Sequence, residues 1–175
     1  MYAYLRLLWM RGKHLFAKPK QLDPRQEHVW SMRPGLTDID VYPEVNNGRH
    51  FVLFDLARYQ LAMKIGLFRW VRKTRSAFVV AGSTIRYKHR LLPWRRTEIH
   101  TQLVGMDDRF FYFQHKTLQR NKTCSVALVR TGVRRKGVIP PAEVMEGIGM
   151  PFQPFMEPWV RLLYTSDAAD DYIRV

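Results

Sequence analysis

An acidic loop that runs directly into a helical pattern is the first place in this chain where chemistry can be expected. Asp38, Asp40 and Glu44 gather there, although the chain as a whole carries a formal net charge of +14. Asn46 and Asn47 follow, and either is a good N-cap, because an Asn side chain accepts a hydrogen bond from a first-turn amide. The carboxylates therefore have two interpretations. They neutralise and cap the helix start, or one of them meets a substrate there as a base or nucleophile.

The helix that should position this loop is predicted from Asn47 onward, where apolar residues recur at spacings of three and four and Gly66 is the expected stop. Two titratable side chains on it are further candidates. His50 is close enough to the helix start to reach a pocket, although packing or hydrogen bonding is the commoner role of such a histidine. Asp55 is expected to pair with Arg58 three residues later, ahead of any part in chemistry.

Residues 77–132 predict β-structure. They contain strand-length segments rich in Val, Ile, Thr and aromatic residues, separated by turn signals, and HVWSMRP at 28–34 predicts a shorter strand that stops at Pro34-Gly35. Because consecutive strands with short turns favour antiparallel pairing, we expect a four- or five-stranded antiparallel meander that wraps the long helix, in an α+β fold. PPAEVMEG at 140–147 predicts a second, short helix with proline at its first positions.

The charge of the chain selects a class of partner. A net charge of +14 and a pI near 10.3 favour polyanions, such as nucleic acid, an anionic membrane or a phosphorylated small molecule. The sequence has no zinc knuckle, RNA-recognition strand or helix-turn-helix pattern, so nucleic acid is not the expected partner. The basic residues that could contact phosphate, or could equally form a solvated surface, are Arg86, Lys88, Arg90, Arg95, Arg96, Arg134, Arg135 and Lys136.

Cysteine and histidine usage indicates neither disulfides nor a metal site. Cys124 is the one cysteine of the sequence, and the six histidines have no zinc-ligand spacing. We therefore expect a buried thiol, no bound metal, and a reducing compartment such as the cytoplasm.

The two ends of the chain differ from its middle. Residues 1–26 predict an amphipathic helix and a linker, and residues 1–16 either pack on the protein or make peripheral contact with an anionic membrane. No stretch is apolar for long enough to span a membrane. The main domain is expected at 27–150, followed by a proline and aromatic extension at 151–163. Residues 164–175 are suddenly acidic, and we expect this tail not to be native.

The acidic stretch resembles the pattern DxDxxGHVNNxxYLxxxExAR of hotdog-fold acyl-CoA thioesterases related to 4-hydroxybenzoyl-CoA thioesterase. Asp55 stands where that family usually has Glu. The wider run, including GMDDRFFYF at 105–113 and VIPPAEVMEGIG at 138–149, is similar to the thioesterase superfamily member 6 branch, and the resemblance covers roughly residues 1–163. The residues that match the pattern are Asp38, Asp40, Val45, Asn46, Asn47, Ala57 and Arg58.

The resemblance implies a hotdog fold, an antiparallel sheet around one long central helix, and hydrolysis of an acyl-CoA thioester without a metal or other cofactor. Asp40 matches the catalytic carboxylate, and the backbone amide of Asn47 matches the oxyanion donor. It also implies cationic contacts for the CoA phosphates, an apolar slot for the acyl chain and at least a homodimer. The basic residues named above are candidates for the first, and Phe51, Phe54 and Trp70 either line the slot or make core, as most such residues on an amphipathic helix do.

Two departures from the pattern keep a second function open. Family members often have Gly-His where this chain has Pro43-Glu44, and Tyr where it has His50. Proline removes flexibility and an amide donor, and Glu44 adds a negative charge near the proposed reacting centre. The alternative is therefore a non-catalytic acyl-thioester or lipid-binding protein on the same fold.

Overall fold

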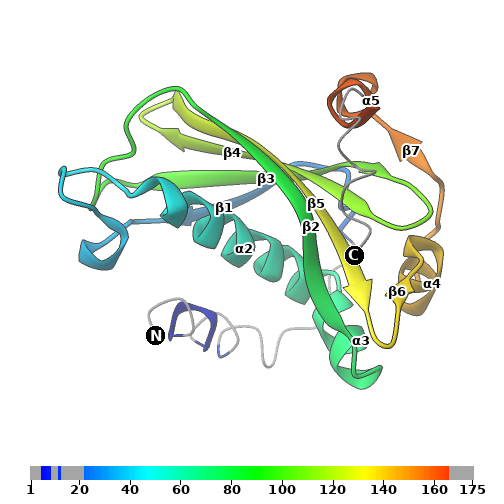
Figure 1. Ribbon diagram of the computed structural model, residues 1–175. Helices are drawn as coiled ribbons and strands as arrows, with labels where there is room; N and C mark the ends of the chain where they lie inside the picture. The colour runs from blue at the N-terminus through cyan, green and yellow to red at the C-terminus, as the bar shows by residue number, and fades with distance from the viewer. Residues whose placement is uncertain (1–4, 9–11, 13–21, 166–175) are drawn as a thin grey trace.

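The structure is a computed structural model that describes residues 5–8, 12 and 22–165, with side chains up to Arg161 in the last helix (Figure 1). The segments that it describes before the main helix are a helical turn at 5–8, strand β1 (His28–Met32) and the 3-10 helix η1 (Leu36–Asp38). The helices that follow are α2 (Asn47–Lys64), α3 (Leu67–Lys73), α4 (Pro141–Gly147) and α5 (Pro158–Thr165). The remaining strands are β2 (Ala77–Tyr87), β3 (Thr97–Met106), β4 (Phe111–Gln119), β5 (Lys122–Arg134), β6 (Val138–Ile139) and β7 (Phe155–Met156).

Both predicted ends of the long helix are confirmed. The side chain of Asn46 is the N-cap of α2 and accepts a hydrogen bond from the amide of Gly48 at 2.9 Å. At the other end, Gly66 has φ 82°, the left-handed conformation that glycine adopts without a steric penalty. The chain turns there and starts the short helix α3, which the sequence pattern did not predict.

In the described part of the chain the sheet is antiparallel and has the order β1-β3-β4-β5-β2, with β6 paired to β5 and β7 to β3. The predicted meander is therefore correct for β3, β4 and β5 and wrong for β2. Strand β2 pairs with β5, from Ala77 opposite Arg134 to Tyr87 opposite Ser125, and residues 88–96 carry the chain back across the sheet to β3. Periodicity along a segment indicates a strand but does not identify its neighbour.

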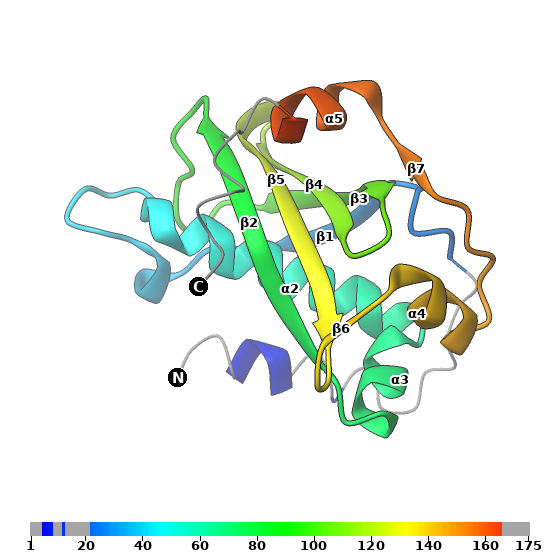
Figure 2. The same ribbon diagram turned by 45° about the vertical axis from the view of Figure 1, so that its right-hand side comes forward.

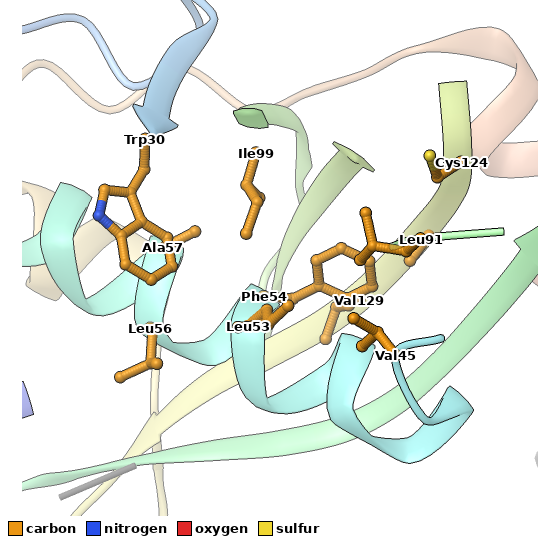
Figure 3. Packing of buried hydrophobic residues seen from close by; sticks show 11 residues of the cluster. Trp30, Val45, Leu53, Phe54, Leu56, Ala57, Leu91, Ile99, Cys124 and Val129 are labelled. Carbon is orange, nitrogen blue, oxygen red and sulfur yellow. The ribbon is translucent and has the colours of Figure 1, made fainter. Parts of the chain in front are cut away.

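Helix α2 lies in the concave face of this sheet, and the curved strands pass over it (Figure 1). Leu53 and Phe54 point from the helix toward Ile99 of β3 and Val129 of β5 (Figure 3). Leu53, Phe54 and Ile99 have no exposed surface. Removing a large side chain of this kind from water contributes roughly 2 to 3 kcal/mol, so this contact fixes the helix against the sheet.

The opposite face of the sheet is partly covered by the C-terminal segment (Figure 2). Val160 of α5 is fully buried and packs with Val104, Tyr112 and Leu128 from three neighbouring strands. The extension expected at 151–163 thus adds β7 to the sheet and most of α5 to its outer layer. The tail expected from 164 begins inside α5, and its residues 166–175 lie outside the described residues, as does most of the segment 1–16.

Candidate functional site

The acidic loop folds back on itself before α2 begins. Ile39 and Val45 form an isolated antiparallel bridge, and the amide of Asp40 donates to the carbonyl of Glu44 at 3.2 Å. The amide of Val45 donates to the carbonyl of Leu91 at 2.7 Å, which fastens the loop to the segment that follows β2. The loop, the helix start and the end of β2 are thereby held together.

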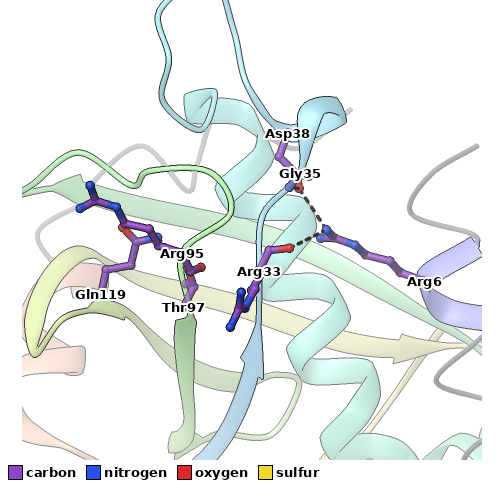
Figure 4. A network of polar contacts seen from close by, with 7 residues as sticks. All are labelled: Arg6, Arg33, Gly35, Asp38, Arg95, Thr97 and Gln119. Atoms are coloured by element: carbon purple, nitrogen blue, oxygen red, sulfur yellow. Dashed lines mark hydrogen bonds and ion pairs between the residues drawn. The ribbon is translucent and has the colours of Figure 1, made fainter.

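Asp38 anchors this loop rather than facing a cavity. Its side chain is 1% exposed, and Oδ2 accepts hydrogen bonds from the amide of Gly35 at 2.8 Å and from the guanidinium of Arg6 at 3.1 Å (Figure 4). Arg6 also donates to the carbonyl of Arg33 at 3.2 Å. This geometry gives Asp38 a structural role, because Gly35 and Arg6 hold the carboxylate inside the fold.

Asp40 is half-buried, and its Oδ1 accepts a hydrogen bond from the amide of Tyr42 at 2.9 Å. This bond closes a local turn and fixes the direction of the carboxylate. The second oxygen, Oδ2, is not engaged by that bond. Asp40 is therefore an oriented carboxylate at the base of the loop, one residue along from the bridge that leads to the helix start.

A cavity of about 200 Å³ opens at the start of α2, and we call it the helix-start cavity. It brings together three of the predicted site residues, Glu44, Asn47 and His50, with the cations of Lys88 and Arg90, whereas Asp40 is not among its lining residues. Its full lining is Glu44, Val45, Asn47, His50, Tyr87, Lys88, His89, Arg90 and Leu91.

The backbone amide of Asn47 is the feature of this cavity best suited to hold a negative charge. Asn47 is the first residue of α2, so its N–H has no intrahelical acceptor, and the positive end of the helix dipole lies there. The Asn46 side chain caps Gly48 instead, which leaves the Asn47 amide for a ligand. The hydroxyl of Tyr87 donates to the carbonyl of Asn47 at 3.0 Å and holds this first turn in place.

Glu44 is the acidic side chain that lines the helix-start cavity. Its side chain is 27% exposed, and its Oε2 accepts from Nε of Arg90 at 2.6 Å. This ion pair links the acidic loop to the segment after β2. It also occupies one carboxylate oxygen, so only the other remains for a proton or a water molecule.

His50 is a buried neutral hydrogen-bonding group. It is 2% exposed, its Nδ1 lies 2.9 Å from Oγ of Ser125, and burial lowers its pKa to about 4. Its ring meets the ring of Tyr87 edge-on, with centroids 5.2 Å apart. An imidazole with this pKa is uncharged at neutral pH, so it positions the first turns of α2 and does not carry a positive charge into the cavity.

Asp55 lies in a different place, at the wall of a second cavity. The predicted pair with Arg58 is confirmed by a direct hydrogen bond. Burial raises the pKa of the Asp55 carboxyl, and Arg58 opposes that shift. Nη1 of Arg58 also lies 2.9 Å from Nε2 of His115. The two carboxylates Asp40 and Asp55 are thus assigned to separate parts of the molecule.

This second cavity, which we call the apolar cavity, has a volume of about 100 Å³ and lies between α2, α4 and strands β2 to β5. Leu61, Ala62 and Met145 are among the residues that line it. Phe51, Phe54 and Trp70 do not line it, so for this cavity they make core rather than a slot. Phe54 is fully buried in the core, and Trp70 packs at the interface of α3 and α4.

The basic residues expected to contact phosphate are spread over several surfaces. Strand β2 ends at Tyr87, so Arg86 lies on the strand whereas Lys88 and Arg90 follow it. Lys88 and Arg90 line the helix-start cavity, and Arg86 and Lys88 line a groove of about 410 Å³ that includes Trp159. Arg95 and Arg96 line another groove beside β3, and Arg134, Arg135 and Lys136 form the exposed turn between β5 and β6.

Two residues that form or support the helix-start cavity could not be predicted from the sequence. Tyr87 lines the cavity and holds the carbonyl of Asn47, and Ser125 holds His50 from 75 positions away. No local pattern marks either residue, because each acts across strands that are distant in sequence. The one available signal was the position of Tyr87 at the end of a predicted strand beside two cations.

Cys124 is buried, as expected, and burial raises the pKa of its thiol. Within the described ranges, no group of three or more His, Cys, Asp or Glu side chains is arranged to hold a metal ion. In the same ranges, no helix has both the length and the apolar character needed to cross a membrane.

Comparison with known proteins now adds to this geometry. Residues 34–148 match the model of the thioesterase-like superfamily. The chain belongs to this superfamily. It is 31% identical over 137 residues to Protein THEM6 of Danio rerio, an alignment that covers 77% of this chain and 67% of that protein. It spans 48% of Protein THEM6 of Xenopus laevis and 55% of that of Drosophila melanogaster, so it corresponds to only part of those relatives.

Comparison with solved structures establishes the fold. The 1,4-dihydroxy-2-naphthoyl-CoA thioesterase of Synechocystis superposes with a TM-score of 0.61 at 10% identity, covering 70% of this chain and 95% of that one. Protein SAV2348 of Staphylococcus aureus, in complex with CoA, superposes with a TM-score of 0.64 at 10% identity, covering 79% of this chain and 94% of that one. Likeness at this identity shows the fold, which is the hotdog fold, as the sequence resemblance implied.

Proposed function

We propose that this protein hydrolyses an acyl-CoA thioester to a free acid and CoA, without a metal ion. The observation that carries the proposal is the helix-start cavity, where the free amide of Asn47 meets a carboxylate-bearing loop and two cations. Membership of the thioesterase-like superfamily supports the reaction class, and the neighbours named for CoA thioesters or bound to CoA support the substrate class.

The chemistry needs an attacking group and an oxyanion donor. A carboxylate accepts a proton from water, and the water oxygen bonds to the thioester carbonyl carbon. The carbonyl oxygen becomes an oxyanion, which the Asn47 amide stabilises with the help of the helix dipole. The tetrahedral intermediate then expels the CoA thiolate, which takes up the proton as the acid is released. If the carboxylate attacks directly, an anhydride forms first and water cleaves it.

Asp40 is the proposed carboxylate, because it matches the position of the catalytic residue in the family pattern. Its bond to the Tyr42 amide leaves one oxygen for water. Glu44 is the direct competitor, since it lines the same cavity as Asn47, but its Oε2 is engaged by Arg90 at 2.6 Å. The two residues lie on facing arms of the same small loop, so separate substitutions are needed to assign the role.

The proposal includes a homodimer. In the described part of the chain, β2 pairs with β5 on one side and with no strand on the other, although it is eleven residues long. An unpaired edge of this length is a template for pairing with a second chain. A second sheet added there would place its residues beside the apolar cavity, whose lining includes Phe78, Val79 and Val80 of β2.

A second candidate function is binding of an acyl thioester or lipid without hydrolysis. The observation that favours it is the orientation of Asp40, whose carboxylate is bonded to Tyr42 and does not line the helix-start cavity. The rigid Pro43 limits movement of this loop toward the cavity.

The test is thiol release from a panel of short, medium, long and aromatic acyl-CoAs, read with a disulfide indicator dye. Release of CoA with multiple turnovers supports hydrolysis. Saturable binding of the same esters, measured by calorimetry, without thiol release would replace hydrolysis with the binding function.

A further inference from the structure

A groove lined by Arg33, Trp94, Arg95, Arg96 and Arg120, which we call the arginine groove, has no part in the chemistry described above. It has a volume of about 560 Å³ and is separate from the helix-start cavity in its lining residues. Its walls come from the end of β1, the segment before β3 and the turn between β4 and β5. Three segments that are far apart in sequence therefore bring four guanidinium groups to one concave surface.

The frame of the arginine groove is fixed by buried polar contacts. Gln119, which is 6% exposed, accepts from the amide of Leu92 at 3.0 Å and donates to the carbonyl of Leu92 at 2.7 Å and to Oγ1 of Thr97 at 2.8 Å. The amide of Trp94 donates to the carbonyl of Pro34 at 2.8 Å. In Figure 4 Gln119 lies beside Arg95 and Thr97, on the neighbouring strand. The groove is thus preorganised, which lowers the entropic cost of binding a ligand.

The charge in the groove is strongly unbalanced. Glu98 is the one carboxylate in its lining and pairs with Arg96 at 3.1 Å. Among the described residues, Arg33, Arg95 and Arg120 make no ion pair with a carboxylate. Guanidinium groups at such a density are typical of sites that bind phosphate through paired hydrogen bonds.

An exposed indole lies among these cations. Trp94 is 57% exposed and has φ 58°, a left-handed conformation that is uncommon for a bulky residue. The contact of its amide with Pro34 holds the backbone in this conformation. An indole face can stack on a nucleobase, so the groove offers separate partners for a flat ring and for several phosphates.

We propose that the arginine groove binds the nucleotide end of coenzyme A, with the adenine on Trp94 and the 3′-phosphate and diphosphate on the arginines. The naming of coenzyme A rests on the proposed function. The two sites are close together along the chain, because Leu91 lines the helix-start cavity and Trp94 lines the groove. These residues are three positions apart, so at most about 11 Å separates their backbones. The pantetheine arm of CoA is long enough to join the two sites, and its thioester end would then reach the amide of Asn47.

The other basic surface serves as a matched control. Arg134 and Arg135 are exposed at the far end of β5, whose first residue, Lys122, follows the groove residue Asn121. The continuous strand Lys122–Arg134 separates them from the groove, and at about 3.3 Å per residue it places these arginines at the other end of the sheet. A double substitution to alanine at either place removes the same charge from the chain.

The experiment is titration calorimetry of the full chain with 3′-phosphoadenosine 5′-phosphate, a probe that has no thioester and cannot be hydrolysed. The double variant Arg33→Ala/Arg120→Ala and the single variant Trp94→Ala should each weaken binding about tenfold or more. The control double variant Arg134→Ala/Arg135→Ala should change it by less than about twofold. Circular dichroism confirms that each exposed substitution leaves the fold intact.

Two results would overturn the proposal. Equal weakening by the control pair would show that the probe responds only to net charge, and equal affinity for adenosine triphosphate and for the 3′-phosphorylated probe would assign the groove to free nucleotides. Because the probe is not a substrate, failure of this proposal is distinguishable from failure of hydrolysis. Thiol release with an unchanged KM in the Arg33→Ala/Arg120→Ala variant would contradict the groove and leave the reaction in place.

Discussion

Two buried histidines fasten helix α2 to the sheet, and the contact of His115 requires a neutral ring. His115 is fully buried, and its pKa is lowered by burial and by the charge of Arg58. Since Arg58 can only donate, Nε2 of His115 accepts at 2.9 Å, and Nδ1–H donates to Oγ1 of Thr101 at 3.0 Å. His50 makes the corresponding contact with Ser125 near the helix start.

The depressed pKa of His50 makes stability depend on pH. Its folded pKa is about 4 and its ordinary value is 6.5, so between these values the unfolded chain binds a proton that the folded chain does not. The free energy of unfolding therefore falls as the pH falls from about 6.5 to about 4. His50→Gln keeps a hydrogen-bonding side chain but cannot titrate. We predict that, on going from about pH 7.5 to pH 5, its free energy of unfolding falls by roughly 2 kcal/mol less than that of wild type.

Urea unfolding at several pH values, followed by circular dichroism, measures this difference. The titration of carboxylates and of His115 is common to both proteins and cancels in the comparison. Parallel pH profiles for wild type and His50→Gln would show that His50 is not held neutral in the folded protein.

Some residues of the site were predictable and others were not. The N-cap at Asn46 and the pair of Asp55 with Arg58 follow from local rules, because the partners are two and three residues apart. The contact of His50 with Ser125 joins positions 75 apart, and the pair of Glu44 with Arg90 joins positions 46 apart. Both depend on where the end of β2 lies, which spacing along the chain does not reveal.

At the scale of elements, α3 and α4 are in contact at Gly147, where a larger side chain would meet the indole of Trp70. A Cβ atom built on Gly147 would lie 2.0 Å from Nε1 of Trp70. We predict that Gly147→Ala destabilises the protein by about 1 to 3 kcal/mol, because the indole must shift out of a packed interface. Gly137→Ala is the matched control, since a Cβ there would meet no atom within 4 Å.

Thermal and urea unfolding of the two variants give the measurement. Equal stability of Gly147→Ala and Gly137→Ala would mean that α4 is not packed against Trp70 as described. The loss should leave the helix-start cavity intact, because neither Gly147 nor Trp70 lines it.

The elements themselves were predicted with uneven success. Helix α2 and strands β3, β4 and β5 have periodic patterns bounded by strong turn or cap signals, and they are where the sequence places them. Helix α3 was missed because seven residues are too few for a periodic signal. The place of β2 at the sheet edge was missed because strand order is set by how the sheet closes over α2, which is a property of the whole fold.

At the scale of the whole molecule, the unpaired edge of β2 leads to a prediction about assembly. We predict that the protein has a mass in solution of two 20.8 kDa chains. The double variant Ser83→Glu/Thr84→Glu should have the mass of a single chain. The two positions are adjacent, exposed and on opposite faces of β2, so the glutamates would bring like charges together where the β2 strands of two chains pair.

Size-exclusion chromatography with light scattering reports these masses. Ser31→Glu, an exposed position on the opposite edge strand β1, is the control and should remain a dimer. A single-chain mass for wild type, or dissociation by Ser31→Glu instead, would contradict pairing through β2.

The central claim is that a carboxylate of the acidic loop attacks, or activates water to attack, a thioester held at the start of α2. The most direct measurement is kcat/KM for thiol release from the best acyl-CoA by wild type, Asp40→Asn and Glu44→Gln. Each substitution removes an ionisable carboxylate with little change in size. We predict a loss of about a hundredfold or more in Asp40→Asn and a much smaller loss in Glu44→Gln. Equal turnover by wild type and Asp40→Asn would contradict the role of Asp40.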